Sequence, residues 1–409
     1  MDDWVCDIAI AETAAGKGLC DRCLGRLFAK LGKGMTNDER GRTVRATLAS
    51  NGIVTDVPEM CPLCDNIFEL LDRFAEAAAE EIMKVGSDNF LIGSRVDPGI
   101  LSKEKELYEE LGAVNAESIK AELNREIGKL TFGRVSRTVE FKNPQVVACV
   151  DTQFADVTLD IAPIFIYGRY NKLSREIPQT IWPCRVCKGK GCKRCNGAGK
   201  MYLTSVQEII GDIALRMTGG KEHFLHGMGR EDIDALMLGT GRPFVLEISE
   251  PRTRNIDLAG LEREANLSDL AKFNSLSFVT RDAVQRTKDL APTKTYKVKV
   301  KADGKVNKER VIGVAQSFRN LCIDQRTPAR VEHRRADLVR KREILWVEAD
   351  WIDDSTFDLT LETESGTYVK EFVSGDDGRS SPNFSDALGV RCRVETLDVL
   401  AINDHGVIR

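Results

Sequence analysis

Four Cys-x-x-Cys pairs are the residues of this chain whose spacing most directly predicts a chemical role. They form two groups, one of Cys20, Cys23, Cys61 and Cys64 and one of Cys184, Cys187, Cys192 and Cys195. Four thiolates fill the tetrahedral coordination shell of zinc, so we expect structural Zn²⁺, one or two ions per chain. Thioredoxin-like redox chemistry is the alternative, but it requires only one pair, placed at a helix start.

A candidate catalytic carboxylate, Asp232, lies in the run Gly229-Arg230-Glu231-Asp232. An ionised carboxylate in a pocket can act as a nucleophile or stabilise charge, and a nearby lysine keeps it ionised. Lys370 is the candidate lysine, and a surface ion pair is its simpler interpretation. A Gly-Arg-x-Asp run alone also fits a polar turn between strands, so its significance depends on the motifs that follow it.

Three runs, in this order, resemble the active-site motifs of pseudouridine synthases: Gly229 to Asp232, Lys294-Thr295-Tyr296 and Gly366 to Lys370. The resemblance makes Asp232 the attacking aspartate and its neighbour Asp234 a structural residue. It also implies that Lys370, just after a strand start, pairs with Asp232.

Isomerising a uridine requires its base to leave the RNA stack, which costs a few kcal/mol. Stacking on an aromatic ring returns about 1 to 3 kcal/mol per base. The resemblance implies that Tyr296, at a strand start, provides this ring, that Tyr368 lines the same pocket and that Leu388 closes it. Buried tyrosines are common in strands, which is the alternative for both rings.

Longer segments make the resemblance more specific. The run Gly239-Thr240-Gly241-Arg242-Pro243-Phe244, the run from Thr327 to Arg335 and the N-terminal cysteine pairs resemble the archaeal tRNA pseudouridine 54/55 synthases, the "Pus ten" family. This likeness covers nearly the whole chain and implies a THUMP-type RNA-binding region in its N-terminal portion. The implied partner is tRNA, with uridines 54 and 55 of the T arm as the substrate. The net reaction moves no electrons, so we expect no organic cofactor, and we infer no obligate protein partner.

Two basic patches are candidates for contacts to RNA phosphates. One covers residues 184–200 and contains no acid, and the other covers residues 325–342 and includes Arg330, Arg334 and Arg335. Arginine forks suit phosphate geometry, so we assign these three arginines and Arg230 to substrate binding. A solvated surface is the alternative for either patch alone.

The composition limits the other classes of function. A net charge of -4 excludes a protein covered in positive charge, so RNA binding must depend on local patches. The start Met1-Asp2-Asp3-Trp4 lacks the positive charge of a signal peptide, and no apolar run approaches the ~18 residues of a membrane span. We therefore expect a cytoplasmic protein without membrane association.

These side chains need a scaffold. The hydrophobic periodicity predicts a mixed α/β first half and a sheet-centred second half with a few helices. Together with the resemblance, it implies an α+β protein whose catalytic domain has a mixed, largely antiparallel sheet with the active cleft across it. The predicted helices cover residues 67–85, 102–111, 116–130 and 206–216. The predicted strands cover residues 146–150, 157–167, 244–248, 296–300, 344–349, 357–363 and 390–399.

Pro178, Pro183 and the glycines of the second cysteine group interrupt this pattern, so we place a domain boundary there. An accessory RNA-binding domain is expected over residues 1–178, with the first zinc module and a THUMP-like region of roughly residues 45–175. The basic cysteine segment follows over residues 179–200, and the catalytic domain over residues 201–409.

Two other functions fit parts of the sequence. A non-catalytic zinc-containing RNA-binding protein would need neither Asp232 nor the tyrosine and lysine downstream of it. A THUMP-containing methyltransferase would need a glycine-rich loop after a strand to hold the methyl donor, and the second half shows no convincing one.

Overall fold

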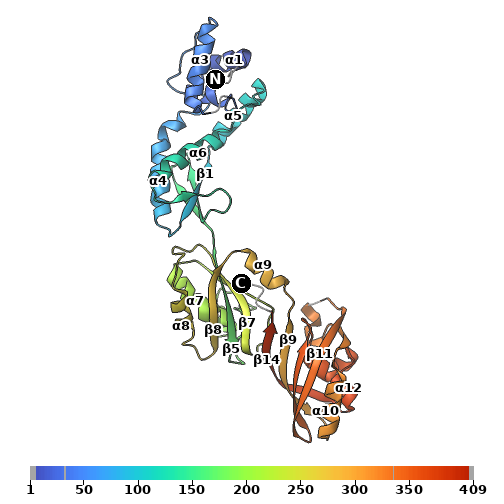
Figure 1. Ribbon diagram of the computed structural model, residues 1–409. Helices are drawn as coiled ribbons and strands as arrows, with labels where there is room; N and C mark the ends of the chain where they lie inside the picture. The colour runs from blue at the N-terminus through green and yellow to red at the C-terminus, as the bar shows by residue number, and fades with distance from the viewer. Residues whose placement is uncertain (1–5, 32–33, 335, 405–409) are drawn as a thin grey trace. The chain divides into compact units, whose positions relative to one another are not determined.

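The computed structural model describes residues 6–31, 34–334 and 336–404. It divides the chain into two compact units (Figure 1). Unit 1 contains the residues up to Ala162 together with Arg252–Arg254, and unit 2 contains Pro163–Pro251 and the residues from Asn255 onward. Among the described residues, no helix has the length and apolar character needed to cross a membrane.

Unit 1 begins with three helices, α1 (Ile8–Gly16), α2 (Asp21–Arg26) and α3 (Asn37–Ser50). The sequence fixes where they start, because Asp7 accepts hydrogen bonds from the first turn of α1 and Thr36 forms a capping box with Glu39 in α3. Their buried faces share one apolar core with the first cysteine group.

The rest of unit 1 is a four-stranded sheet covered by helices. The helical elements are η1 (Ile67–Leu70), α4 (Leu71–Met83), α5 (Pro98–Leu111) and α6 (Ile119–Phe132), and the strands are β1 (Asn89–Arg95), β2 (Thr138–Val139), β3 (Val146–Asp151) and β4 (Val157–Ile161). The strand order is β2-β1-β3-β4, with β1 parallel to β2 and β3. The helices predicted over residues 67–85, 102–111 and 116–130 are confirmed. Helix α5 begins earlier than predicted because Asp97 caps it and Pro98 occupies its first turn.

Unit 2 contains one ten-stranded sheet in the order β13-β10-β11-β12-β9-β14-β7-β5-β8, with β6 also paired to β7. The strands are β5 (Ile164–Lys172), β6 (His223–Gly227), β7 (Leu236–Ile248), β8 (Ala271–Val279), β9 (Thr293–Ala302), β10 (Leu321–Arg326), β11 (Val339–Asp353), β12 (Thr356–Thr363), β13 (Ser380–Ser381) and β14 (Cys392–Asn403). In the described part of the sheet, all neighbours are antiparallel except β7 and β14. The predicted mixed, largely antiparallel sheet is therefore confirmed.

The helices of unit 2 pack on this sheet and define two apolar cores. They are α7 (Val206–Thr218), α8 (Leu258–Ala265), α9 (Asp282–Asp289), α10 (Lys308–Ser317), α11 (Val369–Ser374) and α12 (Phe384–Leu388), with the short turns η2 (Lys193–Cys195), η3 (Ala329–Arg334) and η4 (Asp376–Gly378). One core lies under β5, β7 and β8, and the other lies under β9 to β12. Tyr296 and Leu397 pack against both cores, at the centre of the sheet.

One predicted strand and one predicted boundary differ from the structure. The strand predicted over residues 157–167 is two strands, β4 and β5, which belong to different sheets. Pro163 separates them, since proline has no N–H to donate to a ladder. Because β5 pairs with β7 and β8, it belongs to unit 2. The boundary between the units therefore falls between Ala162 and Pro163 in the chain, earlier than the boundary expected at residue 178.

Candidate active site

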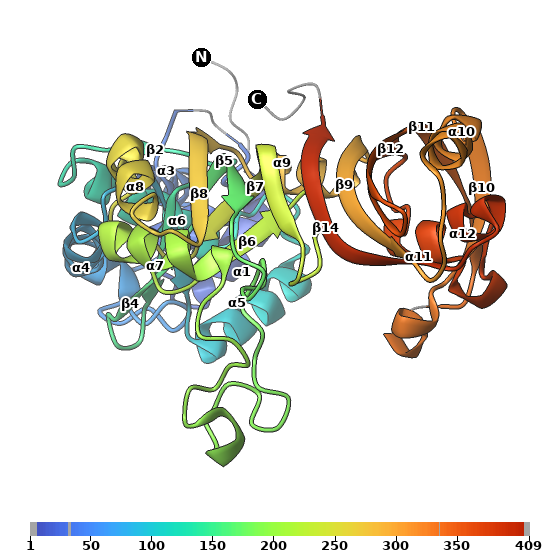
Figure 2. The ribbon, with the colours of Figure 1, turned by 90° about the horizontal axis from the view of Figure 1, so that it is seen from below.

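A cavity of about 260 Å³ lies in unit 2. Residues of β7, β9 and β14 line it, and these strands are neighbours in the sheet (Figure 2). Side chains from these strands, from the β6–β7 loop and from the segments before β11 and α11 form its wall. The lining residues are Arg230, Glu231, Asp232, Arg242, Lys294, Tyr296, Arg330, Val331, Gly366, Thr367, Tyr368, Val369, Lys370, Leu397 and Val399. The three predicted motifs thus meet at one site.

Asp232 lies in the loop between β6 and β7 and lines the cavity. Its side chain is 40% exposed, and its Oδ2 lies 3.3 Å from Nη1 of Arg330 and 3.8 Å from Nζ of Lys370. Arg330 and Lys370 thus both lie near the same oxygen of Asp232. The geometry therefore places an accessible carboxylate at the cavity.

Lys370 is closer to Asp234 than to Asp232. Its Nζ lies 2.9 Å from Oδ2 of Asp234, whose side chain is 66% exposed and does not line the cavity. Burial alone would raise the pKa of Asp234, but the hydrogen bond and the charge of Lys370 outweigh it and lower that pKa. Lys370 therefore contacts both carboxylates, and Asp232 is the one that faces the cavity.

Arg330 forms ion pairs with two acidic residues at the cavity, Asp232 and Glu371. Its Nε donates to Oε1 of Glu371 at 2.6 Å, while its Nη1 faces Asp232. Burial disfavours its charge, but Glu371 and Asp232 raise the pKa of Arg330 above the usual value. Of the other two arginines predicted here, Arg334 is described by its backbone in η3, and Arg335 lies outside the described residues.

Both predicted tyrosines line the cavity, from different types of element. Tyr296 lies on β9 between Leu361 of β12 and Val399 of β14, and burial raises its pKa to about 12. Tyr368 precedes helix α11, and its backbone N–H and C=O both bond the side-chain amide of Gln325. The expected strand start before Lys370 is therefore wrong: a turn and a short helix present that lysine.

Lys294, two residues before Tyr296, also lines the cavity and was not predicted to have a role. Burial, with a further contribution from the positive charge of Arg242, lowers its pKa to about 8. Its Nζ donates to Oγ of Ser365 at 3.4 Å. A Cβ atom added at Gly229 would lie 3.4 Å from this Nζ, so the ammonium borders the bend that carries Asp232.

A buried polar network under the β6–β7 loop positions Asp232. Glu231 accepts from Nε of Arg242 at 2.8 Å and from the hydroxyl of Tyr170 at 2.9 Å. Gln179 donates to that hydroxyl at 2.8 Å and to the Gly229 carbonyl at 3.0 Å. Glu231 and Arg242 belong to the runs that resemble the family, but no local pattern predicts their contacts with Tyr170 and Gln179, because β5, β7 and the loop become neighbours only in the folded sheet.

Lys172, the last residue of β5, also forms hydrogen bonds with the backbone of the β6–β7 loop. Lys172 is fully buried, and its Nζ donates to the backbone carbonyls of Ile177, Asp232 and Ile233 at 3.1, 3.3 and 2.6 Å. Burial lowers its pKa from the usual lysine value. The ammonium of Lys172 thus holds the backbone of Asp232, although Lys172 does not line the cavity.

The aliphatic residue at the cavity is not the one that we expected. Leu388, in α12, is fully buried in the core under β9 to β12 and does not line the cavity. Leu397 of β14 lines it instead. Leu388 is followed by Gly389 at φ +72°, which ends a short helix whose apolar side points into the core, so the motif-like spacing reflects packing.

Arg230 connects the cavity to the second cysteine group. It lines the cavity, and its guanidinium lies 5.7 Å from the ring centroid of Trp182, within the range of a cation–π contact. Trp182 precedes Cys184 by two residues and packs edge-on against Tyr202, with ring centroids 5.6 Å apart.

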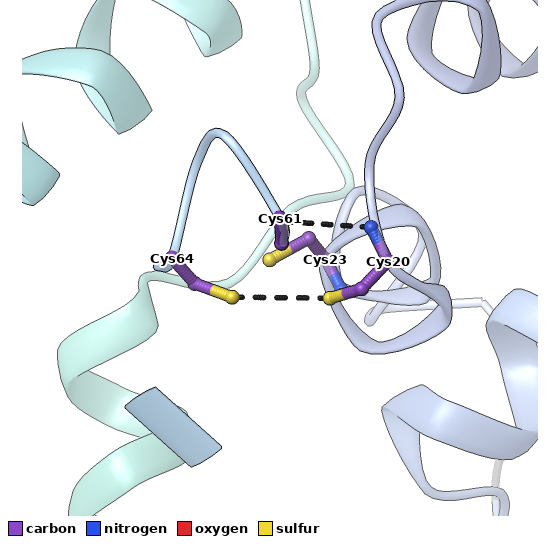
Figure 3. Close-up of side chains that lie close together, drawn as sticks. All are labelled: Cys20, Cys23, Cys61 and Cys64. Carbon is purple, nitrogen blue, oxygen red and sulfur yellow. Dashed lines mark hydrogen bonds between the residues drawn. The ribbon is translucent and has the colours of Figure 1, made fainter. Parts of the chain in front are cut away.

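Both cysteine groups have the geometry of a metal centre. The sulfurs of each group lie within 4.8 Å of one another. The Cys20 and Cys64 sulfurs are 3.8 Å apart (Figure 3), and neighbouring sulfurs in the second group are 3.7 to 3.9 Å apart. A zinc tetrahedron with bonds of about 2.3 Å has sulfurs about 3.8 Å apart, whereas a disulfide is about 2.0 Å long. The distances therefore fit a tetrahedral metal ion and exclude disulfides within these groups.

The first cysteine group is also tied to the helices of unit 1. Arg26, which is fully buried, donates to the Cys23 sulfur at 3.4 Å and to Glu122 at 3.2 Å, and its Nε donates to the Tyr108 hydroxyl. These bonds link α2 to α5 and α6, so we regard this centre as part of the core of unit 1.

Comparisons with known proteins agree with this geometry. Residues 165–403 match the family described as "Pus10, C-terminal", and residues 74–151 match "Pus10 THUMP domain, archaeal". The tRNA pseudouridine synthase Pus10 of Halorubrum lacusprofundi is 38% identical over 97% of this chain and 96% of its own. The protein of the same name from Pyrococcus furiosus is 40% identical over 94% of this chain and 95% of its own.

Proposed function

Since the chain belongs to the Pus10 family of archaeal tRNA pseudouridine synthases, we propose that it isomerises uridines 54 and 55 in the T arm of tRNA, with Asp232 as the nucleophile. The observation that supports this most directly is the position of Asp232. Its carboxylate lies in a cavity between the Arg330 guanidinium and the Lys370 ammonium, beside two tyrosine rings.

The chemistry requires one bond to break and another to form within a single nucleotide. The bond from C1′ of the sugar to N1 of the base breaks, the base turns, and a bond from C1′ to C5 replaces it. A proton leaves C5 and a proton is gained at N1, so the reaction consumes nothing. Asp232 attacks the nucleoside at the start and is released as a free carboxylate at the end.

The cavity walls have two further roles in this proposal. The base leaves the RNA stack at a cost of a few kcal/mol, and the Tyr296 ring offers a face on which it stacks. With its pKa raised to about 12, the Tyr296 hydroxyl stays neutral and adds no negative charge beside Asp232. Arg230, Arg330 and Lys294 line the same cavity and neutralise the phosphates that flank the base.

We further propose that both cysteine groups bind zinc. Zinc with four thiolates has no open coordination position, so it stabilises local structure and takes no part in the isomerisation. The tetrahedral sulfur distances support this assignment for both groups.

The decisive experiment compares Asp232→Asn with Asp234→Asn on an unmodified tRNA transcript, with pseudouridine mapped by carbodiimide labelling and primer extension. We expect Asp232→Asn to lower the single-turnover rate by about 10⁴-fold or more while tRNA binding persists. Asp234→Asn, which retains the shape of the loop, should have a much smaller effect. The reverse result would assign the nucleophile to Asp234.

Transcripts carrying cytidine at position 54 or at position 55 test which uridines are substrates. Each replacement should abolish the label at its own position and preserve the label at the other. If the wild-type protein bound tRNA but labelled neither position, the alternative of a non-catalytic zinc-containing RNA-binding protein would be supported instead.

A further inference from the structure

Helix α11 positions both of the cations that lie near Asp232. It carries Lys370, whose Nζ is 3.8 Å from Oδ2 of Asp232, and the next residue, Glu371, accepts a hydrogen bond from Arg330. Glu371 does not line the cavity, and no motif in the sequence predicted a role for it. Its connection to the site is the guanidinium of Arg330, which faces the same Asp232 oxygen.

Arg330 is held more closely by Glu371 than by Asp232. Its Nε lies 2.6 Å from Oε1 of Glu371, whereas its Nη1 lies 3.3 Å from Oδ2 of Asp232. The Glu371 side chain is 7% exposed and the Asp232 side chain is 40% exposed. Because water screens an exposed ion pair more than a buried one, the pair with Glu371 is the stronger of the two.

Glu371 is itself fixed in position. The residue that follows it, Phe372, is fully buried in the core under β9 to β12. The chain beside Arg330 is tied to the same part of unit 2, because the Ala329 N–H donates to Oδ2 of Asp376 at 3.1 Å. The carboxylate of Glu371 is therefore a rigid anchor for the long side chain of Arg330.

This anchor limits how Arg330 can pair with Asp232. A guanidinium binds a carboxylate most strongly through two parallel N–H bonds. While Nε is engaged by Glu371, Arg330 can offer Asp232 only its terminal nitrogens. Without Glu371, the whole fork would be free to turn toward Asp232. A closed pair of this kind stabilises the free carboxylate more than the transition state, and so it slows the attack.

We propose that Glu371 is a positioning residue for the isomerisation, which holds Arg330 back from a closed pair with Asp232 and keeps that carboxylate accessible to the nucleoside. The proposal rests on the proposed function, since it takes Asp232 as the nucleophile. Held through its Nε, Arg330 still directs its terminal nitrogens into the cavity, where they suit a phosphate of the substrate. Glu371 is buried, so it acts on the rate through Arg330 and not through a contact with RNA.

The first test is Glu371→Gln in the full-length protein. Glutamine retains the shape of the side chain but removes the charge that holds the guanidinium. We expect the single-turnover rate at saturating unmodified tRNA transcript to fall roughly 10- to 100-fold, as is typical when a reacting group is misplaced. The affinity for the same transcript, measured by filter binding, should change much less, because Glu371 does not contact the substrate.

Removing Arg330 as well should reverse this loss. In Glu371→Gln/Arg330→Gln no guanidinium can close on Asp232, so the single-turnover rate at saturating tRNA should exceed that of Glu371→Gln and approach that of Arg330→Gln. Both Glu371 variants lack the same carboxylate and share any folding defect that its loss causes. Rescue by a second substitution is therefore not expected of a merely structural role.

A matched control removes a carboxylate from another buried ion pair of unit 2. Asp404 pairs with Arg169 at 3.0 Å, and neither residue lines the cavity. Asp404→Asn should leave the single-turnover rate near that of the wild type.

Three results would overturn the proposal. They are a wild-type rate in Glu371→Gln, a double variant that is no faster than Glu371→Gln, and an equal loss of rate in Asp404→Asn. Failure of the proposed function appears separately, as a wild-type protein that forms no pseudouridine or as an Asp232→Asn variant that retains the wild-type rate.

Discussion

Two aspartates, separated by one residue, have different surroundings at this site. Asp232 faces the cavity with Arg330 and Lys370 near the same oxygen, whereas Asp234 points to solvent and holds Lys370 at 2.9 Å. Lys370 is thus positioned by Asp234 as well as by Asp232. We infer that Asp234 orients the ammonium of Lys370 beside Asp232.

Lys294 gives the site a pH dependence whose sign follows from its burial. Its pKa of about 8 means that the ammonium, present at neutral pH, is lost as the pH rises through about 8. We therefore expect kcat/KM for tRNA to fall above pH 8 in the wild type. Lys294→Arg should abolish this fall because arginine stays charged, and Lys294→Met should be impaired at every pH.

The contribution of Lys294 to the free energy of unfolding rises above pH 8, where the activity is expected to fall. An unfolded lysine keeps its proton up to about pH 10.4, while folded Lys294 loses it near pH 8. Between these values the unfolded state binds more protons, so the contribution of Lys294 to stability rises with pH. A fall in activity above pH 8 accompanied by unfolding, or one that persists in Lys294→Arg, would contradict the assignment.

The sequence identified the site residues that belong to contiguous motifs and missed those that depend on tertiary register. Asp232, Tyr296, Tyr368 and Lys370 were predicted from three short runs and line one cavity. Glu231, Arg242 and Tyr170 meet only because β5 pairs with β7, which no local pattern shows. Leu388 was expected from the resemblance, whereas the pairing of β14 with β9 presents Leu397 at the cavity.

At the scale of elements, the segment of the second cysteine group, Cys184–Lys200, depends on glycines where two stretches of its backbone cross. A Cβ atom at Gly191 would lie 2.7 Å from the Gly197 carbonyl oxygen, and one at Gly199 would lie 2.4 Å from that of Gly189. Real Cβ atoms do not approach backbone oxygens so closely. Only glycine lets the two Cys-x-x-Cys halves come close enough to share one ion.

Gly191→Ala should therefore prevent the second cysteine group from holding the proposed zinc ion. We expect the zinc content, measured by atomic absorption on the purified protein, to fall from two ions per chain toward one. Gly197→Ala is the matched control, because Gly197 has a similar φ of +81° but no atom within 4 Å of its added Cβ. If both variants lost the ion equally, backbone strain and not the crossing would be the cause.

Most helices and strands were predictable because their capping residues and alternation are local. The exceptions are positions where tertiary contacts determine where a strand or helix begins or ends. The apolar run over residues 157–167 reads as one strand, and only the separate partners of β4 and β5 reveal two. Likewise, Gly366 and Thr367 precede the short helix α11, whose start is fixed by the contact of Tyr368 with Gln325.

At the scale of the whole molecule, the described residues form one apolar core in unit 1 and two in unit 2. Of the two cysteine groups, only the first is part of such a core. Cys23, Cys61 and Cys64 are buried in the core of unit 1. In the second group Cys184 is buried, but its three partners are partly exposed. Losing the proposed zinc ion of the first group should therefore have different consequences from losing that of the second group.

Cys61→Ser should unfold unit 1 and spare unit 2. A structural zinc contributes about 10 to 16 kcal/mol in isolated zinc-finger peptides, which exceeds the stability of most small domains. We expect reduced helical circular dichroism and, in limited proteolysis, a resistant fragment that begins near Pro163. Cys149→Ser, on β3 and outside both groups, should change neither measurement, and full protease resistance in Cys61→Ser would contradict the prediction.

The order of strands could not be predicted from the sequence, and it has a consequence for synthesis. Strand β14 lies between β9 and β7, its parallel contact with β7 spans only two residue pairs, and it contributes Leu397 and Val399 to the cavity. A nascent chain that has emerged only as far as α12 already contains both cysteine groups, but the sheet of unit 2 is in two pieces. Products of termination before β14 are thus expected to bind metal without turnover.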